Sequence, residues 1–131
     1  MKLVLSSTLM AGAGMVLGAV GMHAVNAATA RAPAFLIANV TDIRDAAMWK
    51  KYQAEVPATS IAFEGKTLAR GNAVEVDATS SPPDGTIVVV QFPDLKHLLG
   101  WYNSPAYAKV KPLRLNSVTT HLYAVEGVPS S

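Results

Sequence analysis

The sequence predicts an α+β domain over residues 34–127, with the element order β-α-β-β-α-β. Two observations support this prediction. Each of two amphipathic helical patterns is flanked by short runs rich in β-branched and apolar residues. The two middle strands are joined by a loop rich in Pro and Gly, without a helix between them. This order predicts one antiparallel sheet of four strands with both helices on the same face.

Residues 1–27 differ in composition from the rest of the chain. They contain 17 apolar residues and four of the nine glycines, and Lys2 is their single Lys, Arg, Asp or Glu. A short basic start, an apolar stretch and small residues ending at Ala27 are typical of a secretory signal peptide. The alternative is an uncleaved membrane anchor, but the apolar stretch is shorter than the roughly 20 residues that a spanning helix needs. We therefore expect cleavage after Ala27, export to the periplasm or beyond, and no stable membrane insertion after cleavage.

The remaining 104 residues are enough for one small domain with its own core. They carry ten Lys and Arg against nine Asp and Glu, a net charge of +1, which gives no reason to expect nucleic acid as a partner. The chain has no cysteine, which excludes disulfides, a thiolate nucleophile and cysteine-ligated metal centres. Residues 28–33 are expected to be a flexible lead-in, and residues 128–131 a tail.

A buried strand and an amphipathic helix open the domain. The apolar run 34–40 predicts the strand, and Thr41 or Asp42 after it can cap the next helix by accepting a hydrogen bond from a free N–H. The apolar residues of that helix share one face: Met48, Trp49, Tyr52 and Val56. We expect Pro57 and then Gly65 to mark the end of the helical region.

Two strands joined by a loop follow. Residues 66–77 predict an extended segment, and Gly71-Asn72 within it indicates a bulge. Residues 80–85 are a loop, because two prolines restrict the backbone and an Asp-Gly pair turns it. The β-branched run 86–92 is the clearest strand of the chain and is expected at the centre of the sheet.

A second helical segment and a last strand complete the domain. Asp94 is expected to cap the helix, whose apolar residues follow the helical repeat: Leu95, Leu98, Leu99 and Tyr102. Ser104 and Pro105 restart it as a cap and a first helical residue, and Pro112 is expected to bend or end it. Residues 119–126 form the last strand. The resulting order is the split β-α-β arrangement of ferredoxin-like folds.

Both faces of the predicted sheet are apolar. Alternation places Phe35 and Ile37 on one face of the first strand, and Leu36 and Ala38 on the other. The strand 86–92 is apolar on both sides as well. Such a sheet needs a cover beyond its helices, and a second copy of the chain is the simplest one. We therefore predict a homodimer in which two sheets face each other.

Several segments, taken together, carry a resemblance to a known family. They are residues 35–40, Arg70-Gly71-Asn72 with Glu75, residues 88–93, residues 101–107 and Leu113-Arg114. In these segments the chain resembles the bacterial family named domain of unknown function 1330, which is similar to the dimeric α/β-barrel superfamily. The resemblance spans residues 34–127. It implies the same ferredoxin-like fold and the same dimer, and it implies no established activity.

Two positions depart from the pattern of that family. Relatives usually have Arg-Gly-Gly where this chain has Asn72 in the third position. They usually have Ser-Pro-Glu-Tyr where this chain has Ala106 in place of the glutamate. An acid that serves only the first turn of a helix is easily replaced, whereas loss of a functional glutamate would change the function of this chain.

Few residues are left as candidates for chemistry. His97 and His121, the two histidines after residue 27, lie on different predicted elements and have no metal-ligand spacing. No motif for a nucleotide or another cofactor occurs either, so we expect no metal and no cofactor. Arg70, beside the expected bulge, and Arg114, at the end of the second helical segment, can bind a carboxylate through forked N–H donors. The alternative is a structural ion pair, for instance of Arg70 with Glu75.

Aromatic and amide side chains form the second set of candidates. We interpret four aromatic residues as core: Trp49, Tyr52, Tyr102 and Tyr107. Trp101 lies off the apolar stripe of its helix and four residues after His97, so the two can border a pocket or pack on the following loop. Asn39 and Gln91 are polar positions in apolar strands, and their partners are each other, the backbone or a ligand.

Two classes of function remain open. One is small-molecule binding in a cleft lined by Arg, Asn and aromatic residues, with or without catalysis. The superfamily resemblance implies that some relatives are cofactor-independent oxygenases or isomerases, and Asn39, Arg70 and Trp101 would then position the substrate, although no general base is evident. The other class is a non-catalytic dimeric interaction module. A pocket of roughly 300 Å³ or more with convergent polar groups favours the first class, and a sealed core favours the second.

Overall fold

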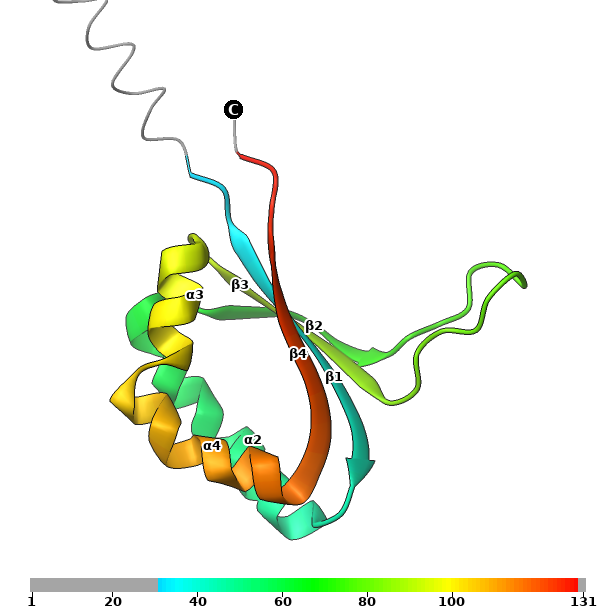
Figure 1. Ribbon diagram of the computed structural model, residues 1–131, viewed down its shortest axis with the longest axis horizontal. Helices are drawn as coiled ribbons and strands as arrows, with labels where there is room; N and C mark the ends of the chain where they lie inside the picture. The colour runs from blue at the N-terminus through cyan, green and yellow to red at the C-terminus, as the bar shows by residue number, and fades with distance from the viewer. Residues whose placement is uncertain (1–30, 130–131) are drawn as a thin grey trace, which may run out of the picture. The chain divides into compact units, whose positions relative to one another are not determined.

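The structure, a computed structural model, describes residues 31–129. All helices and strands named below lie in one compact unit, Ala32–Pro129. The expected signal peptide and its cleavage site lie outside the described residues. Within them the order β-α-β-β-α-β is observed, with the second helical segment divided into two helices (Figure 1). The elements are β1 (Ala34–Ile43), α2 (Ala46–Ser60), the short 3-10 helix η1 (Ile61–Phe63), β2 (Lys66–Asn72), β3 (Thr86–Phe92), α3 (Leu95–Tyr102), α4 (Pro105–Ser117) and β4 (Val118–Glu126).

Within residues 31–129, four strands form one antiparallel sheet in the order β2-β3-β1-β4. The β-branched strand β3 has the bounds that the sequence predicts and lies beside β1 at the centre of the sheet. Helices α2, α3 and α4 all cover the same face (Figure 1). The predicted α+β class and layering are therefore confirmed. The sheet of a single chain is open, because β2 and β4 are edges, and it does not close into a barrel by itself.

Strand alternation divides the sheet into a covered and an uncovered face. Leu36, Val88 and Phe92 point toward the helices and are buried. The core between sheet and helices is formed by Ala34, Leu36, Tyr52, Phe92, Leu98, Trp101, Tyr107 and Val110. The opposite side, here called the open face, carries Phe35, Ile37, Val89, Tyr123 and Val125. Tyr123 and Val125 are 53% and 50% exposed, so this apolar face has no cover within the described residues.

Side-chain caps start the helices, and one of them differs from the prediction. Asp94 caps α3 and Ser104 caps α4, as predicted. The cap of α2 is Asp45, whose carboxylate accepts a hydrogen bond from a first-turn N–H at 2.9 Å. The prediction that Thr41 or Asp42 caps this helix was wrong, because β1 continues as far as Ile43 in its pairing with β4.

Two prolines lie inside helices. Pro57 belongs to α2, which continues to Ser60, and Pro112 belongs to α4, which continues to Ser117. Pro57 therefore does not end the first helix, whereas the helical region ends at Phe63, before Gly65 as predicted, and α4 does not end at Pro112. A proline removes one hydrogen bond of the helix. Packing of α2 against α4 stabilises the turns on both sides of the missing bonds.

The strand β2 is shorter than the extended segment predicted for residues 66–77. It ends at Asn72, and residues 73–85 form a loop that extends away from the sheet (Figure 1). Its irregular pairing lies between Thr67 and Ala69, not at Gly71-Asn72 as the sequence predicts. All seven residues of this edge strand are exposed. The location of the bulge matters for the site, because it determines which β2 side chains face the helices.

Candidate functional site

A cavity of about 340 Å³ lies between the covered face of the sheet and the helices. Strand alternation supplies its apolar floor, and α2, α3 and α4 supply its walls. The apolar floor is formed by Leu36, Ala38, Val88, Val90, Phe92 and Leu122. Both tryptophans of the chain, Trp49 and Trp101, line the walls. The site is thus an apolar pocket with a small number of polar groups, which are described below.

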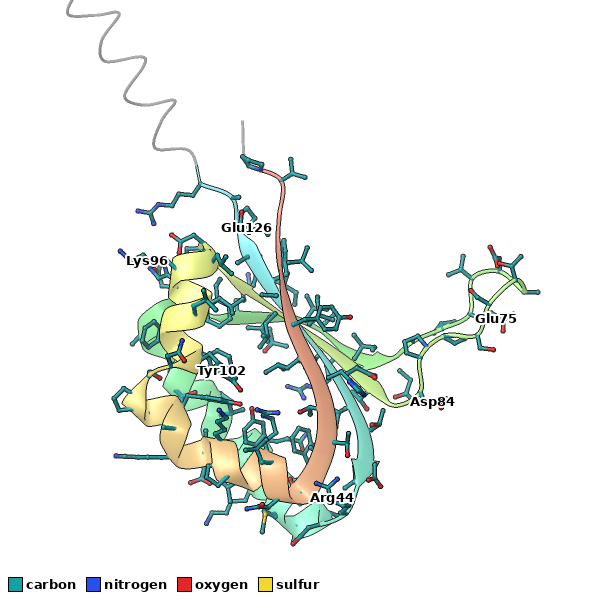
Figure 2. The ribbon with its side chains drawn as sticks, viewed as in Figure 1. Arg44, Glu75, Asp84, Lys96, Tyr102 and Glu126 are labelled. Atoms are coloured by element: carbon teal, nitrogen blue, oxygen red, sulfur yellow. The ribbon has the colours of Figure 1, made fainter. Side chains whose placement is uncertain are left out.

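Arg114 is the buried charge of this cavity. Helix α4 carries it inward, and its side chain is only 5% exposed. Its Nε donates a hydrogen bond to the Tyr107 hydroxyl at 3.0 Å, and its terminal nitrogens donate to the hydroxyls of Thr120 and, at 3.4 Å, Tyr102. Tyr102 lies on the inner side of the helical layer (Figure 2). Within residues 31–129 no carboxylate pairs with Arg114.

The guanidinium remains charged in this setting. Burial alone would lower the pKa of Arg114, but the neighbouring tyrosines, Tyr107 first and then Tyr52 and Tyr102, together outweigh this effect, and the pKa lies above its ordinary value. Tyr107 is fully buried, and its hydroxyl lies 3.0 Å from the hydroxyl of Tyr52. Burial, followed by the proximity of Tyr107, raises the pKa of Tyr52 well above its ordinary value. The centre of the network is therefore a cation bonded to hydroxyl groups.

The direction of the hydrogen bonds in this network follows from the donors available. A guanidinium has no acceptor, so the Tyr107 oxygen must accept from Arg114. The proton of Tyr107 then needs another acceptor, and within the described part of the chain the Tyr52 oxygen is the one within reach. Tyr52 lines the cavity. Its own proton is thus left to donate toward the cavity.

Arg70 is the second arginine of the lining. It lies opposite Val88 in the β2–β3 pairing, so its side chain leaves the sheet on the covered face. Because β2 is an edge strand, Arg70 remains exposed. It makes no ion pair with Glu75, which lies on the projecting loop between β2 and β3 (Figure 2). The alternative of a structural Arg70–Glu75 pair is therefore wrong, and the cavity lining contains two arginines and no Asp, Glu, Lys or His.

Trp101 belongs to the core as well as to the cavity. It is 4% exposed, its ring centre lies 4.4 Å from that of Tyr107, and its Nε1 donates to the Thr59 hydroxyl at 2.9 Å. The prediction that Trp101 lies off the buried stripe was wrong. Leu99, predicted on that stripe, is 47% exposed. The short helix α3 is rotated so that Leu98 and Trp101 face inward together.

The remaining three candidates lie away from the cavity. Asn39 and Gln91 are on the open face, where the Asn39 amide donates to the carbonyl oxygen of Asp84 at 2.8 Å and holds the base of the loop. His97 lies beside the cap of α3, with its Nδ1 2.6 Å from the carboxylate of Asp94. Of the six residues predicted from the sequence, the structure thus brings Arg70, Trp101 and Arg114 together at one cavity.

Tyr52, Tyr107 and Thr120 are site residues that the sequence interpretation did not assign to a ligand site. Tyr52 and Tyr107 are indeed core residues, but their hydroxyls organise the polar end of the cavity. A signal was present, because a tyrosine at a core position needs a hydrogen-bond partner that a phenylalanine does not. Thr120 offered no comparable signal in its strand.

Neither a metal-binding cluster nor a membrane-spanning helix is found within the described residues. In the part of the chain that the structure describes, no three His, Asp or Glu residues lie close enough together to hold a metal ion. His121 is exposed on β4. None of the helices within residues 31–129 combines the length and apolar character needed to cross a membrane.

Solved structures with the same fold show low sequence identity to this chain. RPA0582, a protein of unknown function from Rhodopseudomonas palustris, is 13% identical with a TM-score of 0.61, and the match covers 82% of this chain and 92% of that one. A dimeric ferredoxin-like protein of unknown function from Thermobifida fusca YX is 10% identical with a TM-score of 0.51, covering 73% and 92%. A Dabb family protein with a ferredoxin-like fold from Mesorhizobium loti MAFF303099 is also 10% identical with a TM-score of 0.51, covering 77% and 100%. These similarities show the fold, which is ferredoxin-like as the element order predicts.

No curated protein matches the chain. The family model described as domain of unknown function (DUF1330) matches residues 33–128, nearly the whole of the described domain. This match confirms the resemblance that the segments around Arg70 and Trp101 carry. The chain therefore belongs to the DUF1330 family.

Proposed function

We propose that this protein is an exported homodimer that binds a small, largely apolar molecule in the cavity between sheet and helices. The cavity is the observation that carries the proposal. Its volume of about 340 Å³ lies in the range typical of ligand pockets, roughly 300–1,000 Å³. An apolar lining with a few convergent polar groups is also typical of such pockets. The cavity supports ligand binding over a pure interaction module, which a sealed core would favour.

The lining favours binding over acid–base catalysis. General acids and bases in proteins are most often His, Glu or Asp, and none of these lines the cavity. Arg114 stays protonated, and the raised pKa of Tyr52 keeps its hydroxyl neutral. The groups present can hold and orient a ligand, and they are poorly suited to exchange protons with it.

The homodimer is proposed from the open face. Its apolar side chains, with Tyr123 and Val125 half exposed, form a surface that a second copy can cover by a sheet-to-sheet contact. A neighbour with the same fold, the protein from Thermobifida fusca, is dimeric. Light scattering coupled to gel filtration tests this part of the proposal. A monomer at micromolar concentration would contradict it.

Export is proposed from residues 1–27. Mass spectrometry of the protein purified from a periplasmic or secreted fraction should give a chain that begins at Ala28. A cytoplasmic protein that retains residues 1–27 would contradict both cleavage and export.

Ligand binding is tested with octan-1-ol, a neutral apolar probe. Because both tryptophans line the cavity, its binding should change their fluorescence. The variant Ala38→Phe places a ring on the cavity floor and should weaken binding at least about tenfold. Ala124→Phe is the matched control, because Ala124 lies exposed on β4 and does not line the cavity. Equal affinity of the two variants, both folded by circular dichroism, would place the probe elsewhere and refute the proposal.

A further inference from the structure

We infer that the ligand of this cavity carries a carboxylate on an apolar body, that Arg114 binds the carboxylate, and that Tyr52 donates a further hydrogen bond to it. The inference rests on the proposed function, because it names the ligand class of the same cavity. Three features carry it: the charge of the lining, the direction of its hydrogen bonds, and the distribution of its apolar surface.

The charged residues of the cavity lining are all positive. A buried cation is costly unless an opposite charge or a full set of hydrogen bonds compensates it. Arg114 is buried, and its partners within residues 31–129 are neutral hydroxyls: Tyr102, Tyr107 and Thr120. Arg70 adds a second positive charge to the same lining, and no acid balances either arginine there. An anionic ligand supplies the missing charge.

The hydrogen bonds point the same way. A guanidinium has five N–H groups, and the described hydroxyl partners of Arg114 account for three. Two N–H groups are left, and the Tyr52 proton is also left to face the cavity. Tyr52 and Arg114 both bond to the Tyr107 hydroxyl, so they lie at the same end of the cavity. A cluster of donors matches a carboxylate, which in its ionised form only accepts, and it rejects an ammonium group, which only donates.

The apolar surface determines the rest of the ligand. The floor of the cavity consists largely of aliphatic strand residues such as Val88 and Val90, and Trp49 forms part of the wall. This lining matches a hydrocarbon or aromatic body. Arg70, exposed on the edge strand, lies where it attracts an anion approaching from solvent. The two arginines therefore have different roles: Arg114 binds inside, and Arg70 acts at the periphery.

The first experiment compares three probes of equal chain length on the purified protein: octanoate, octanamide and octan-1-ol. Tryptophan fluorescence titrations at neutral pH measure the three dissociation constants. We expect octanoate to bind at least about tenfold more tightly than octanamide, as a charge-assisted hydrogen bond implies. Equal affinities of all three probes would overturn the inference and leave the proposed function intact. Failure of all three to bind would overturn the proposed function itself.

The second experiment locates the carboxylate. Arg114→Met should reduce the preference for octanoate over octanamide to less than about twofold, while octan-1-ol still binds. Lys109→Met is the matched control, because it removes the same charge from an exposed position of the same helix, outside the cavity. An unchanged preference in Arg114→Met would overturn the assignment.

A third variant addresses the case in which Arg114→Met does not fold. Tyr52→Phe removes a single hydroxyl from the cavity and keeps the ring. It should weaken octanoate binding about three- to tenfold, the usual effect of one lost hydrogen bond. Unchanged octanoate affinity in this variant would show that Tyr52 does not contact the anion, and would overturn that part of the inference.

Discussion

Replacing Tyr107 with Phe removes one oxygen atom from the centre of the buried network and leaves the aromatic packing in place. Tyr107 is fully buried, and its hydroxyl joins Arg114 and Tyr52. In the variant the Nε–H of Arg114 loses its acceptor, and the Tyr52 hydroxyl loses its donor. Neither group gains access to water at that position, because the phenyl ring of the variant would fill the same space.

The magnitude follows from the two lost bonds. A hydrogen bond between neutral groups contributes about 1 kcal/mol, and one to a charged group about 1.5–3 kcal/mol. The free energy of unfolding should therefore fall by about 2–4 kcal/mol. For a domain of this size the corresponding decrease in Tm is roughly 10–20 °C.

Urea unfolding at a fixed protein concentration, followed by tryptophan fluorescence, measures this difference. The matched control is Tyr123→Phe, since Tyr123 is half exposed and makes no side-chain hydrogen bond within the described residues. The control should lose less than about 0.5 kcal/mol. If Tyr107→Phe also lowers the free energy of unfolding by less than about 0.5 kcal/mol, the hydrogen-bond network does not stabilise the fold. The role assigned to the buried network around Arg114 would then be refuted.

Three further predictions test other parts of the structure. The raised pKa of Tyr52 means that the folded protein holds this proton more tightly than the unfolded chain, so this contribution to stability is complete below about pH 10 and declines as the pH rises above it. The urea unfolding midpoint should therefore fall more between about pH 8 and pH 10.5 in the wild type than in Tyr52→Phe. An equal fall in the two proteins would contradict the buried environment of Tyr52. Gly85→Ala should lower the free energy of unfolding by at least about 2 kcal/mol, because Gly85 has φ +83° and a Cβ there would lie 2.0 Å from a β1 carbonyl oxygen. Gly71→Ala is the control, because a Cβ at Gly71 would have no atom within 4 Å. Similar unfolding curves for the two variants would refute the clash. Asp94→Ala should lower the free energy of unfolding by about 1 kcal/mol through loss of the α3 cap, whereas Glu75→Ala, a change at an exposed loop residue, should cause no measurable change. Equal thermal unfolding of the two variants would show that Asp94 does not cap α3.

The parts of the fold that depend on local chemistry could be predicted from the sequence. The bounds of β3 and the caps Asp94 and Ser104 all follow from a few adjacent residues. The errors arise where contacts with distant parts of the chain determine the local structure. Pro57 remains inside α2 because packing against α4 stabilises the helix around it. The cap of this helix moved from Thr41 or Asp42 to Asp45 because pairing with β4 extends β1.

The candidate site shows the same division. Arg70 and Arg114 could be named because a guanidinium can bind a carboxylate through forked donors, and both line the cavity, although the bulge expected beside Arg70 lies between Thr67 and Ala69. Asn39 and Gln91 could not be placed, because alternation defines two faces of a strand without showing which one the helices cover. Trp101 was misplaced because the rotation of a two-turn helix depends on what it packs against, not on its own repeat.

The strand order also governs when this domain can form during synthesis. Within this domain the central strand β1 is made first and its neighbour β4 last, so β1 lacks one side of its pairing until almost the whole domain has been synthesised. The helix that carries Arg114 is completed just before that moment. Closing so long a segment makes folding late and comparatively slow. A domain that stays unfolded until its last strand is made can still pass through a narrow translocation channel, which suits the export proposed for this protein.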